Sequence, residues 1–74
     1  MNNRRISIHD FQFRPHGYGH YKVTYTSPKT GISWSNITNN MVLIDLTKND
    51  NKPLIKNLNR LKWMCKQGTK YRNK

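Results

Sequence analysis

Apolar and polar residues alternate along residues 19–27 of the chain. One side of an extended segment would present Tyr21, Val23 and Tyr25, and the other Lys22, Thr24 and Thr26. Strict alternation of this kind predicts a β-strand with one face buried and the other in water.

A turn follows this strand at Ser27-Pro28-Lys29-Thr30-Gly31. Proline suits the second position of a turn, and glycine adopts the left-handed conformation that closes it. We therefore expect a β-hairpin in which Ser27 pairs with Ile32, so that Tyr25 faces Trp34 and Thr24 faces Ser35. The apolar face of this hairpin holds Tyr21, Val23, Tyr25, Ile32 and Trp34, and the polar face holds Lys22, Thr24, Thr26, Ser33 and Ser35.

Residues 53–67 have the periodicity of an amphipathic helix that can cover the apolar face. At about 100° per residue, a narrow stripe contains Leu54, Leu58, Leu61 and Cys65, with Ile55 and Met64 beside it. Asp50 or Asn51 can cap the N-terminus, Pro53 suits the first turn and Gly68 the C-terminal stop. We expect the stripe to pack on the hairpin.

Two other apolar segments are less regular. The spacing of Ile6, Ile8, Phe11 and Phe13 predicts another strand, with a bulge or bend near His9 and Asp10 where the parity switches. The segment Met41 to Leu46 is either a short buried strand or a packed connector. The predicted fold class is α+β: a small antiparallel sheet of about three strands packed against one C-terminal helix. The domain spans residues 6–68, between a basic N-terminal arm (1–5) and a basic C-terminal tail (69–74).

The charge of the chain is one-sided. Its 74 residues include 14 Lys and Arg against three acids, which gives a formal charge of +11. Such a surface repels itself unless an anionic partner relieves the repulsion, and nucleic acid is the commonest such partner. Eight of the cations follow Asp50, where no acid occurs. This field favours phosphate binding, with a solubility tail as the alternative.

The composition also bears on cellular context. The longest apolar run is Met41 to Ile44, so we expect no membrane span and no signal peptide. A single cysteine, Cys65, excludes an internal disulfide and fits a reducing cytoplasm, bacterial or phage-infected. The absence of Ala and Glu and the abundance of Asn, Lys and Ile indicate adenine- and thymine-rich codons, as in a phage or mobile element.

Catalysis and metal binding find little support. The three Asp are scattered, and no nucleophile has a recognisable base beside it. His16 and His20 are four apart, but Pro15, Gly17 and Gly19 oppose the helix that would bring them together. We therefore expect no enzymatic activity, no metal and no cofactor.

Trp63 is the most distinctive candidate for nucleic-acid contact, because it falls about 180° from Leu54 on the helix. An indole on the wet side of a helix, among cations, suits contact with a phosphate backbone and stacking on a base or sugar. The alternative is that Trp63 rests on a neighbouring segment and the cations are a solvated face. The predicted contact residues are Arg4, Arg5, Lys22, Lys52, Lys56, Arg60, Trp63, Lys66, Lys70 and Arg72.

The segment from Gly19 to Gln67 resembles the integrase arm-binding and plant AP2-type DNA-binding domains, in which a three-stranded antiparallel sheet precedes a helix. The resemblance rests on the Tyr21-Lys22-Val23-Thr24-Tyr25 strand, the Pro28-Lys29-Thr30-Gly31 turn and the Leu-rich helix. It implies a sheet in the major groove, with Lys22, Thr24, Ser33 and Ser35 facing the bases; the connection over residues 39–52 is longer than in the compact version. If the resemblance is set aside, the polar face of the hairpin is expected to be an ordinary solvated sheet face.

A shorter likeness concerns the loop before the strand. Gly17-Tyr18-Gly19-His20-Tyr21-Lys22-Val23 is similar to part of an RNA-binding signature in which strand aromatics stack on bases. The alternating helices of that fold are not predicted here. Locally, Tyr18 and His20 on a glycine-flanked loop are placed to reach a base.

These observations predict a small protein that binds DNA, with RNA as the alternative, mainly through phosphate contacts. A second function class is a phage accessory or host-takeover inhibitor whose cations dock on an acidic protein surface. A third is a structural component of a larger particle.

Overall fold

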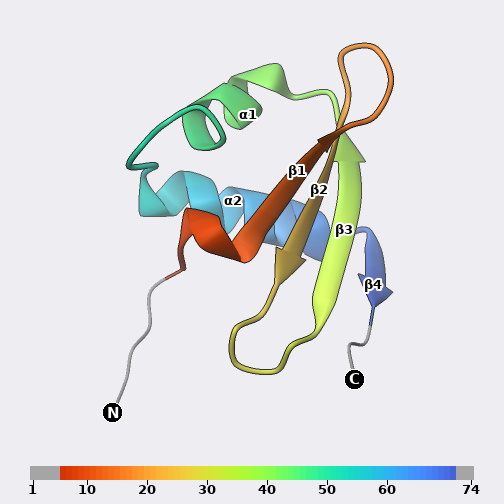
Figure 1. Ribbon diagram of the computed structural model, residues 1–74, viewed down its shortest axis with the longest axis vertical. Coiled ribbons are helices and arrows are strands. Elements are labelled where there is room, and N and C mark those ends of the chain that lie inside the picture. The colour runs from red at the N-terminus through yellow and green to blue at the C-terminus, as the bar shows by residue number, and fades with distance from the viewer. Residues whose placement is uncertain (1–5, 72–74) are drawn as a thin grey trace.

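The computed structural model describes residues 6–71, and it confirms the α+β fold class. Strands β1 (Phe11–Pro15), β2 (Tyr21–Thr26), β3 (Ser33–Thr38) and β4 (Thr69–Tyr71) form one antiparallel sheet in the order β1-β2-β3-β4. A short 3-10 helix, η1 (Ile8–Asp10), precedes β1. Helices α1 (Met41–Thr47) and α2 (Ile55–Lys66) lie on one face of the sheet (Figure 1). The described part of the chain therefore has one strand and one α-helix more than the sequence predicts.

The β2–β3 hairpin has the predicted register. Tyr25 lies opposite Trp34 and Thr24 opposite Ser35, and the Ser27 amide donates to the Ile32 carbonyl at 2.9 Å. Gly31 has φ of 77°, as the turn requires. The register could be predicted from alternation and turn chemistry because both depend only on residues close together in the chain.

The bend expected near His9 and Asp10 is the 3-10 helix η1. The Ser7 hydroxyl accepts a hydrogen bond from the His9 amide at 3.2 Å, and the Asp10 carboxylate accepts one from the Ser7 amide at 3.2 Å. This reciprocal cap tightens the chain into one turn. The strand expected from Ile6 onward therefore starts only at Phe11, opposite Tyr25.

The segment for which a strand or a connector was expected is helix α1. The Asn40 side chain caps it by accepting from the Leu43 amide at 3.1 Å. Leu43, Ile44 and Thr47 are buried, and Thr47 lies one helical turn after the other two. Thr47 satisfies its hydroxyl by donating to the Leu43 carbonyl at 2.7 Å. A short aliphatic run fits a strand or a helix equally, and the Asn40 cap and this spacing decide for the helix.

Helix α2 begins later than predicted. Its N-cap is Leu54, and no side-chain hydrogen bond from residues 6–71 caps it, so the prediction of an Asp50 or Asn51 cap is wrong. Asp50 instead accepts from the Lys52 amide at 3.0 Å. Leu54 is extended and 58% exposed, so it does not belong to the packed stripe. The stripe consists of Leu58, Leu61 and Cys65, all buried.

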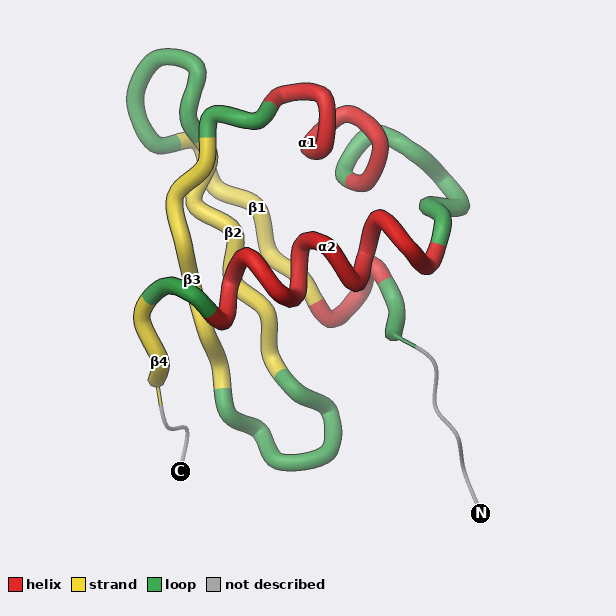
Figure 2. Tube along the Cα trace, turned by 180° about the vertical axis from the view of Figure 1, so that it is seen from behind, coloured by secondary structure: helices red, strands yellow, loops and turns green. Residues whose placement is uncertain are grey.

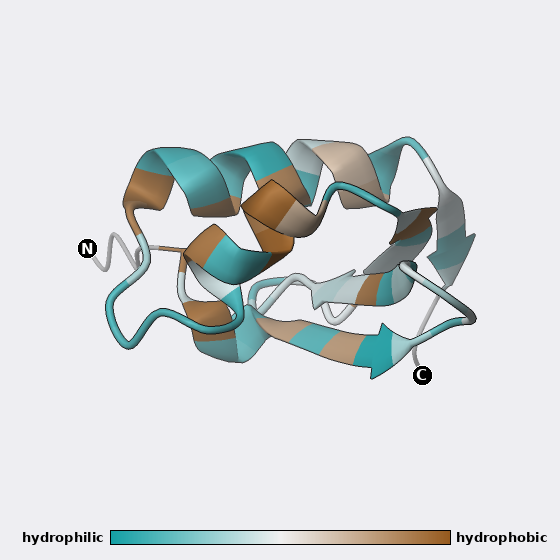
Figure 3. Cartoon of the chain, turned by 90° about the horizontal axis from the view of Figure 1, so that it is seen from above, coloured by the Kyte–Doolittle hydropathy of each residue, from teal (hydrophilic) through white to brown (hydrophobic). Residues whose placement is uncertain are grey.

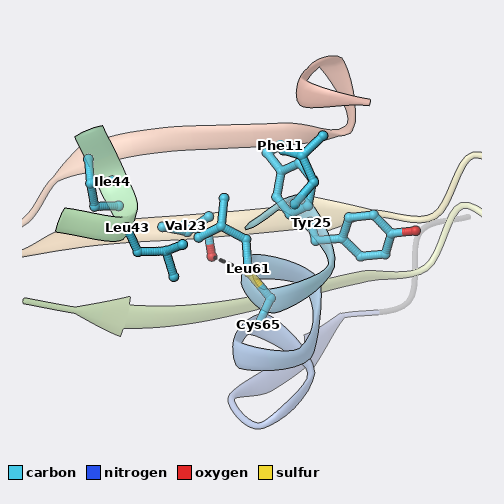
Figure 4. Close-up of a cluster of buried hydrophobic side chains, with 8 residues drawn as sticks. Phe11, Val23, Tyr25, Leu43, Ile44, Leu61 and Cys65 are labelled. Atoms are coloured by element: carbon cyan, nitrogen blue, oxygen red, sulfur yellow. Dashed lines mark hydrogen bonds between the residues drawn. The ribbon is translucent and has the colours of Figure 1, made fainter. Parts of the chain in front are cut away.

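The core lies between α2 and the inner face of the sheet, with α1 closing one end (Figure 2). Its buried apolar members are Phe11, Val23, Tyr25, Leu43, Ile44, Leu58, Leu61 and Cys65, most of them labelled in Figure 4. The Cys65 thiol donates to the Val23 carbonyl at 3.4 Å. Burial raises the pKa of this thiol to about 12, so it stays protonated and packs as a small apolar group.

Residues 69–71, which the sequence assigns to a basic tail, form strand β4; Arg72 to Lys74 lie outside the described residues. Strand β4 can form because Gly68 lets the backbone pass close to Ser35. A Cβ at that position would collide with the Ser35 carbonyl oxygen and lie 2.9 Å from the Asn36 Cβ. The Asn36 amide also donates to the Met64 carbonyl at 2.9 Å, tying the end of α2 to β3. The chain can then turn back and pair with β3.

Candidate nucleic-acid interface

The outer face of α2, defined here as Lys56, Asn59, Arg60 and Trp63, points away from the sheet. The helical period places it opposite the buried stripe of the same helix. Trp63 is 66% exposed, which confirms the predicted helix register and rejects the alternative that a neighbouring segment covers it. An indole left largely in water is available to a partner.

Two cations on this face border a shallow cavity. Lys56 and Arg60 are one helical turn apart and line it with Asn57, around a volume of about 170 Å³. Side chains with this spacing converge on the same patch of surface. The arrangement can hold one anionic group between an ammonium and a guanidinium.

Acidic side chains do little to offset these charges. Helix α2 has four cations and no acid. Among the acids, Asp45 accepts from the Asn49 side-chain amide at 2.9 Å, Asp50 from a backbone amide, and Asp10 belongs to the cap of η1. The face therefore keeps an unbalanced positive field, which attracts phosphates over long range.

Other predicted cations lie on the side of the molecule where α2 meets β3. The Lys66 Nζ is 4.6 Å from the centroid of the Trp34 ring, and Lys70 pairs across from Trp34 on β4. Lys62 is 5.8 Å from the Tyr25 ring centroid. In these cation–π contacts the ammonium groups lie over the aromatic rings. Lys66 and Lys70 are thus exposed but separate from the outer face of α2, whereas exposed Lys52 precedes that helix.

The sheet face turned away from the helices, called the open face below, is polar. It consists of Gln12, Arg14, Lys22, Thr24, Thr26, Ser33, Ser35, Ile37, Thr69 and Tyr71. Ser33 and Ser35 are buried on it, because β4 and its neighbours flank them. Thr26 and Ser33 share a hydrogen bond of 2.8 Å. The predicted polar face of the hairpin therefore forms the centre of the larger open face.

The β3–β4 edge of the open face contains a pocket of about 180 Å³. Lys22 lines it with Ser35, Asn36, Ile37, Gly68, Thr69 and Tyr71. The Ser35 hydroxyl donates to the Tyr71 hydroxyl at 3.3 Å. This hydrogen bond, and next the charge of Lys22, lower the pKa of Tyr71 below its usual value.

The sequence predicted one of the two cations on the open face, Lys22, and missed the other cation and Tyr71. Lys22 was expected there, but Arg14, which pairs directly across from it, was not in the predicted set. Tyr71 was missed because residue 71 was assigned to a tail. The alternation Phe11, Gln12, Phe13, Arg14 was the available signal for Arg14. Arg4, Arg5 and Arg72 lie outside the described residues.

The β1–β2 loop presents Tyr18 at its tip, where the side chain is fully exposed. Gly17 and Gly19 have φ of 77° and 67°, and the His16 amide donates to the His20 carbonyl at 3.0 Å. The His20 Nδ1 lies 2.6 Å from the Tyr18 carbonyl. Tyr18 is therefore free to contact a partner, whereas the hydrogen bonds hold His20 to the loop.

Two further properties concern residues 6–71. Within them, no three histidine, cysteine or acidic side chains gather in a way that could hold a metal ion. Neither α1 nor α2 has the length and apolarity that crossing a bilayer demands.

Comparison of the chain with protein-family models, with curated proteins and with solved structures gives no match.

Proposed function

We propose that this protein binds nucleic acid, duplex DNA in preference to RNA, mainly through phosphate contacts on the outer face of α2. The observation that supports this most is the 66% exposed Trp63, on a helix with four cations and no acid. A small domain with few apolar residues would gain stability by burying an indole, so the exposure of Trp63 among cations favours a role in contacting a partner.

The chemistry of binding follows from the two kinds of group on this face. Lys56 and Arg60 would neutralise backbone phosphates, and each neutralised phosphate releases condensed counterions into solution. Trp63 would add contact with an exposed sugar or base face. Neither interaction identifies a base sequence, so the proposed binding on this face is sequence-tolerant.

The open face is the second part of the proposal. The resemblance to integrase arm-binding and AP2-type domains implies a sheet in the major groove, and the polar open face, free of helices, is compatible with that role. Lys22 and Thr24 would then approach base edges, flanked by Arg14. We place the activity in the cytoplasm of a bacterial or phage-infected cell, where the Cys65 thiol stays reduced.

Replacing Trp63 with Ala tests the function directly. The variant is expected to keep its thermal transition, because two thirds of the indole already contacts water. Its affinity for a random-sequence duplex is expected to fall roughly 5- to 160-fold, the range for loss of one aromatic contact of about 1–3 kcal/mol. The measurement is a gel shift in modest salt, where the unaltered protein should retard the duplex at low micromolar concentration.

A matched pair of lysine variants distinguishes binding by the outer face of α2 from binding that depends only on net charge. Lys56→Gln should weaken the shift, whereas Lys29→Gln, on the exposed β2–β3 turn, should change it little. Equal effects of the two would mean that binding follows net charge alone. Loss of the thermal transition in Trp63→Ala would instead show that the indole supports the fold.

A further inference from the structure

The two cationic surfaces point in opposite directions. Helix α2 packs its buried stripe against the sheet, so Lys56 and Trp63 project outward from the helix layer. On β2, Val23 is buried toward α2, and Lys22 next to it projects from the other side of the sheet. The edge-on view in Figure 3 shows the helices as one layer and the strands as another. The outer face of α2 and the open face are therefore back to back.

The open face has a positive charge of its own. Arg14 and Lys22 are directly paired across β1 and β2. Like charges in such a position destabilise a sheet by a few tenths of a kcal/mol or more. An anion between them would remove this repulsion, because it would pair with both. The pairing thus favours an anionic ligand on the open face independently of α2.

The pocket at the β3–β4 edge supplies the matching hydrogen-bond donors. The Tyr71 hydroxyl oxygen accepts a hydrogen bond from the Ser35 hydroxyl at 3.3 Å, and Lys22 lines the same pocket. Because the Ser35 hydroxyl donates to this oxygen, the phenolic proton of Tyr71 can be donated to an acceptor outside the protein. A phosphate oxygen in the pocket of about 180 Å³ would meet this proton and the Lys22 ammonium.

One straight duplex cannot touch both surfaces. A helix layer stacked on a sheet puts the two outer surfaces more than about 10 Å apart, facing opposite ways. The molecule is two layers thick, and its Cα extents are 41 × 27 × 16 Å. A duplex bound on α2 therefore leaves the open face exposed to a second segment. We propose that a single molecule bridges two nucleic-acid segments, one on each surface, an inference that rests on the proposed function.

A capture assay tests bridging. Biotinylated duplex on beads is mixed with the protein, and retention of a second, fluorescent duplex is measured in modest salt. The unaltered protein should retain the second duplex. The double variant Arg14→Gln/Lys22→Gln should lower retention about tenfold or more, while its gel shift on one duplex falls only a few-fold, since α2 still binds. Lys56→Gln/Arg60→Gln should also lower retention about tenfold, since both surfaces are needed.

Two further variants control for charge and for the pocket. Lys29→Gln/Lys48→Gln removes the same charge elsewhere and should leave retention within about twofold of the unaltered protein. Tyr71→Phe keeps the ring but removes the phenolic proton, and it should lower retention several-fold with an unchanged thermal transition.

The outcomes distinguish the inference from the function on which it rests. A gel shift without retention of the second duplex would overturn bridging and leave nucleic-acid binding in place. Retention that survives Arg14→Gln/Lys22→Gln would also overturn it, because pairs of molecules would then be joining the duplexes through one face. Absence of any gel shift would refute the proposed function itself.

Discussion

Replacing Leu61 with Ala is expected to unfold much of the protein at room temperature. Leu61 is completely buried, in the middle of α2, within the cluster that contains Val23, Leu58 and Cys65. Truncating such a leucine costs about 2–5 kcal/mol, and a domain of this size has a free energy of unfolding of roughly 3–5 kcal/mol. Urea titration followed by far-UV circular dichroism measures the loss.

Leu54→Ala is the matched control for this substitution. The same kind of side chain is removed, but at the N-cap of the helix, where it is 58% exposed. The expected change in the free energy of unfolding is within about 0.5 kcal/mol. A loss as large as that of Leu61→Ala would mean that Leu54 belongs to the core after all.

Gly68→Ala is expected to detach β4 from the sheet. The new methyl group would collide with the Ser35 carbonyl oxygen and crowd the Asn36 Cβ at 2.9 Å. Backbone cannot yield as a flexible side chain does, so we expect a cost of about 1–3 kcal/mol, the range for overpacking. Hydrogen exchange should show the effect locally, as faster exchange of the amides that join Ser33 and Ser35 to β4.

Gly17→Ala provides the comparison for a purely conformational cost. Gly17 has φ of 77°, but a Cβ there would meet no atom within 4 Å. The expected cost is about 1 kcal/mol, from the left-handed conformation alone. Exchange in β4 should be unchanged. Equal exchange in β4 for the two variants would contradict the steric role of Gly68.

Local patterns predicted the hairpin and the faces of α2 well. The β2–β3 register follows from alternation and one turn. The exposed position of Trp63 follows from the helical period, which was counted from Leu54 and holds because Leu58 and Leu61, on the same predicted stripe, are buried. Each feature depends on residues close together in the chain. Leu54 was misplaced because periodicity marks a face but not the residue at which the helix begins, which cap geometry decides.

The missed elements depend on contacts between distant residues. Strand β4 has three residues, too few for a pattern, and it exists because Gly68 lets the chain approach Ser35. Helix α1 was ambiguous because the short apolar run from Met41 to Ile44 fits two structures until the Asn40 cap is known. The same difference between local and long-range contacts decides which parts of the candidate site could be predicted. The α2 face was predictable, whereas the Arg14–Lys22 pairing and the Tyr71 pocket are products of sheet assembly.

Binding of nucleic-acid phosphates by an unbalanced positive surface is the property on which the proposed function depends. Its most direct test is fluorescence anisotropy of a labelled random-sequence duplex, titrated with the protein at several salt concentrations. The logarithm of the binding constant should fall linearly with the logarithm of salt, with a slope of about −0.9 for each phosphate contacted. Three contacts would give about −2.7. A binding constant that does not change with salt, or no binding at low salt, would contradict the claim.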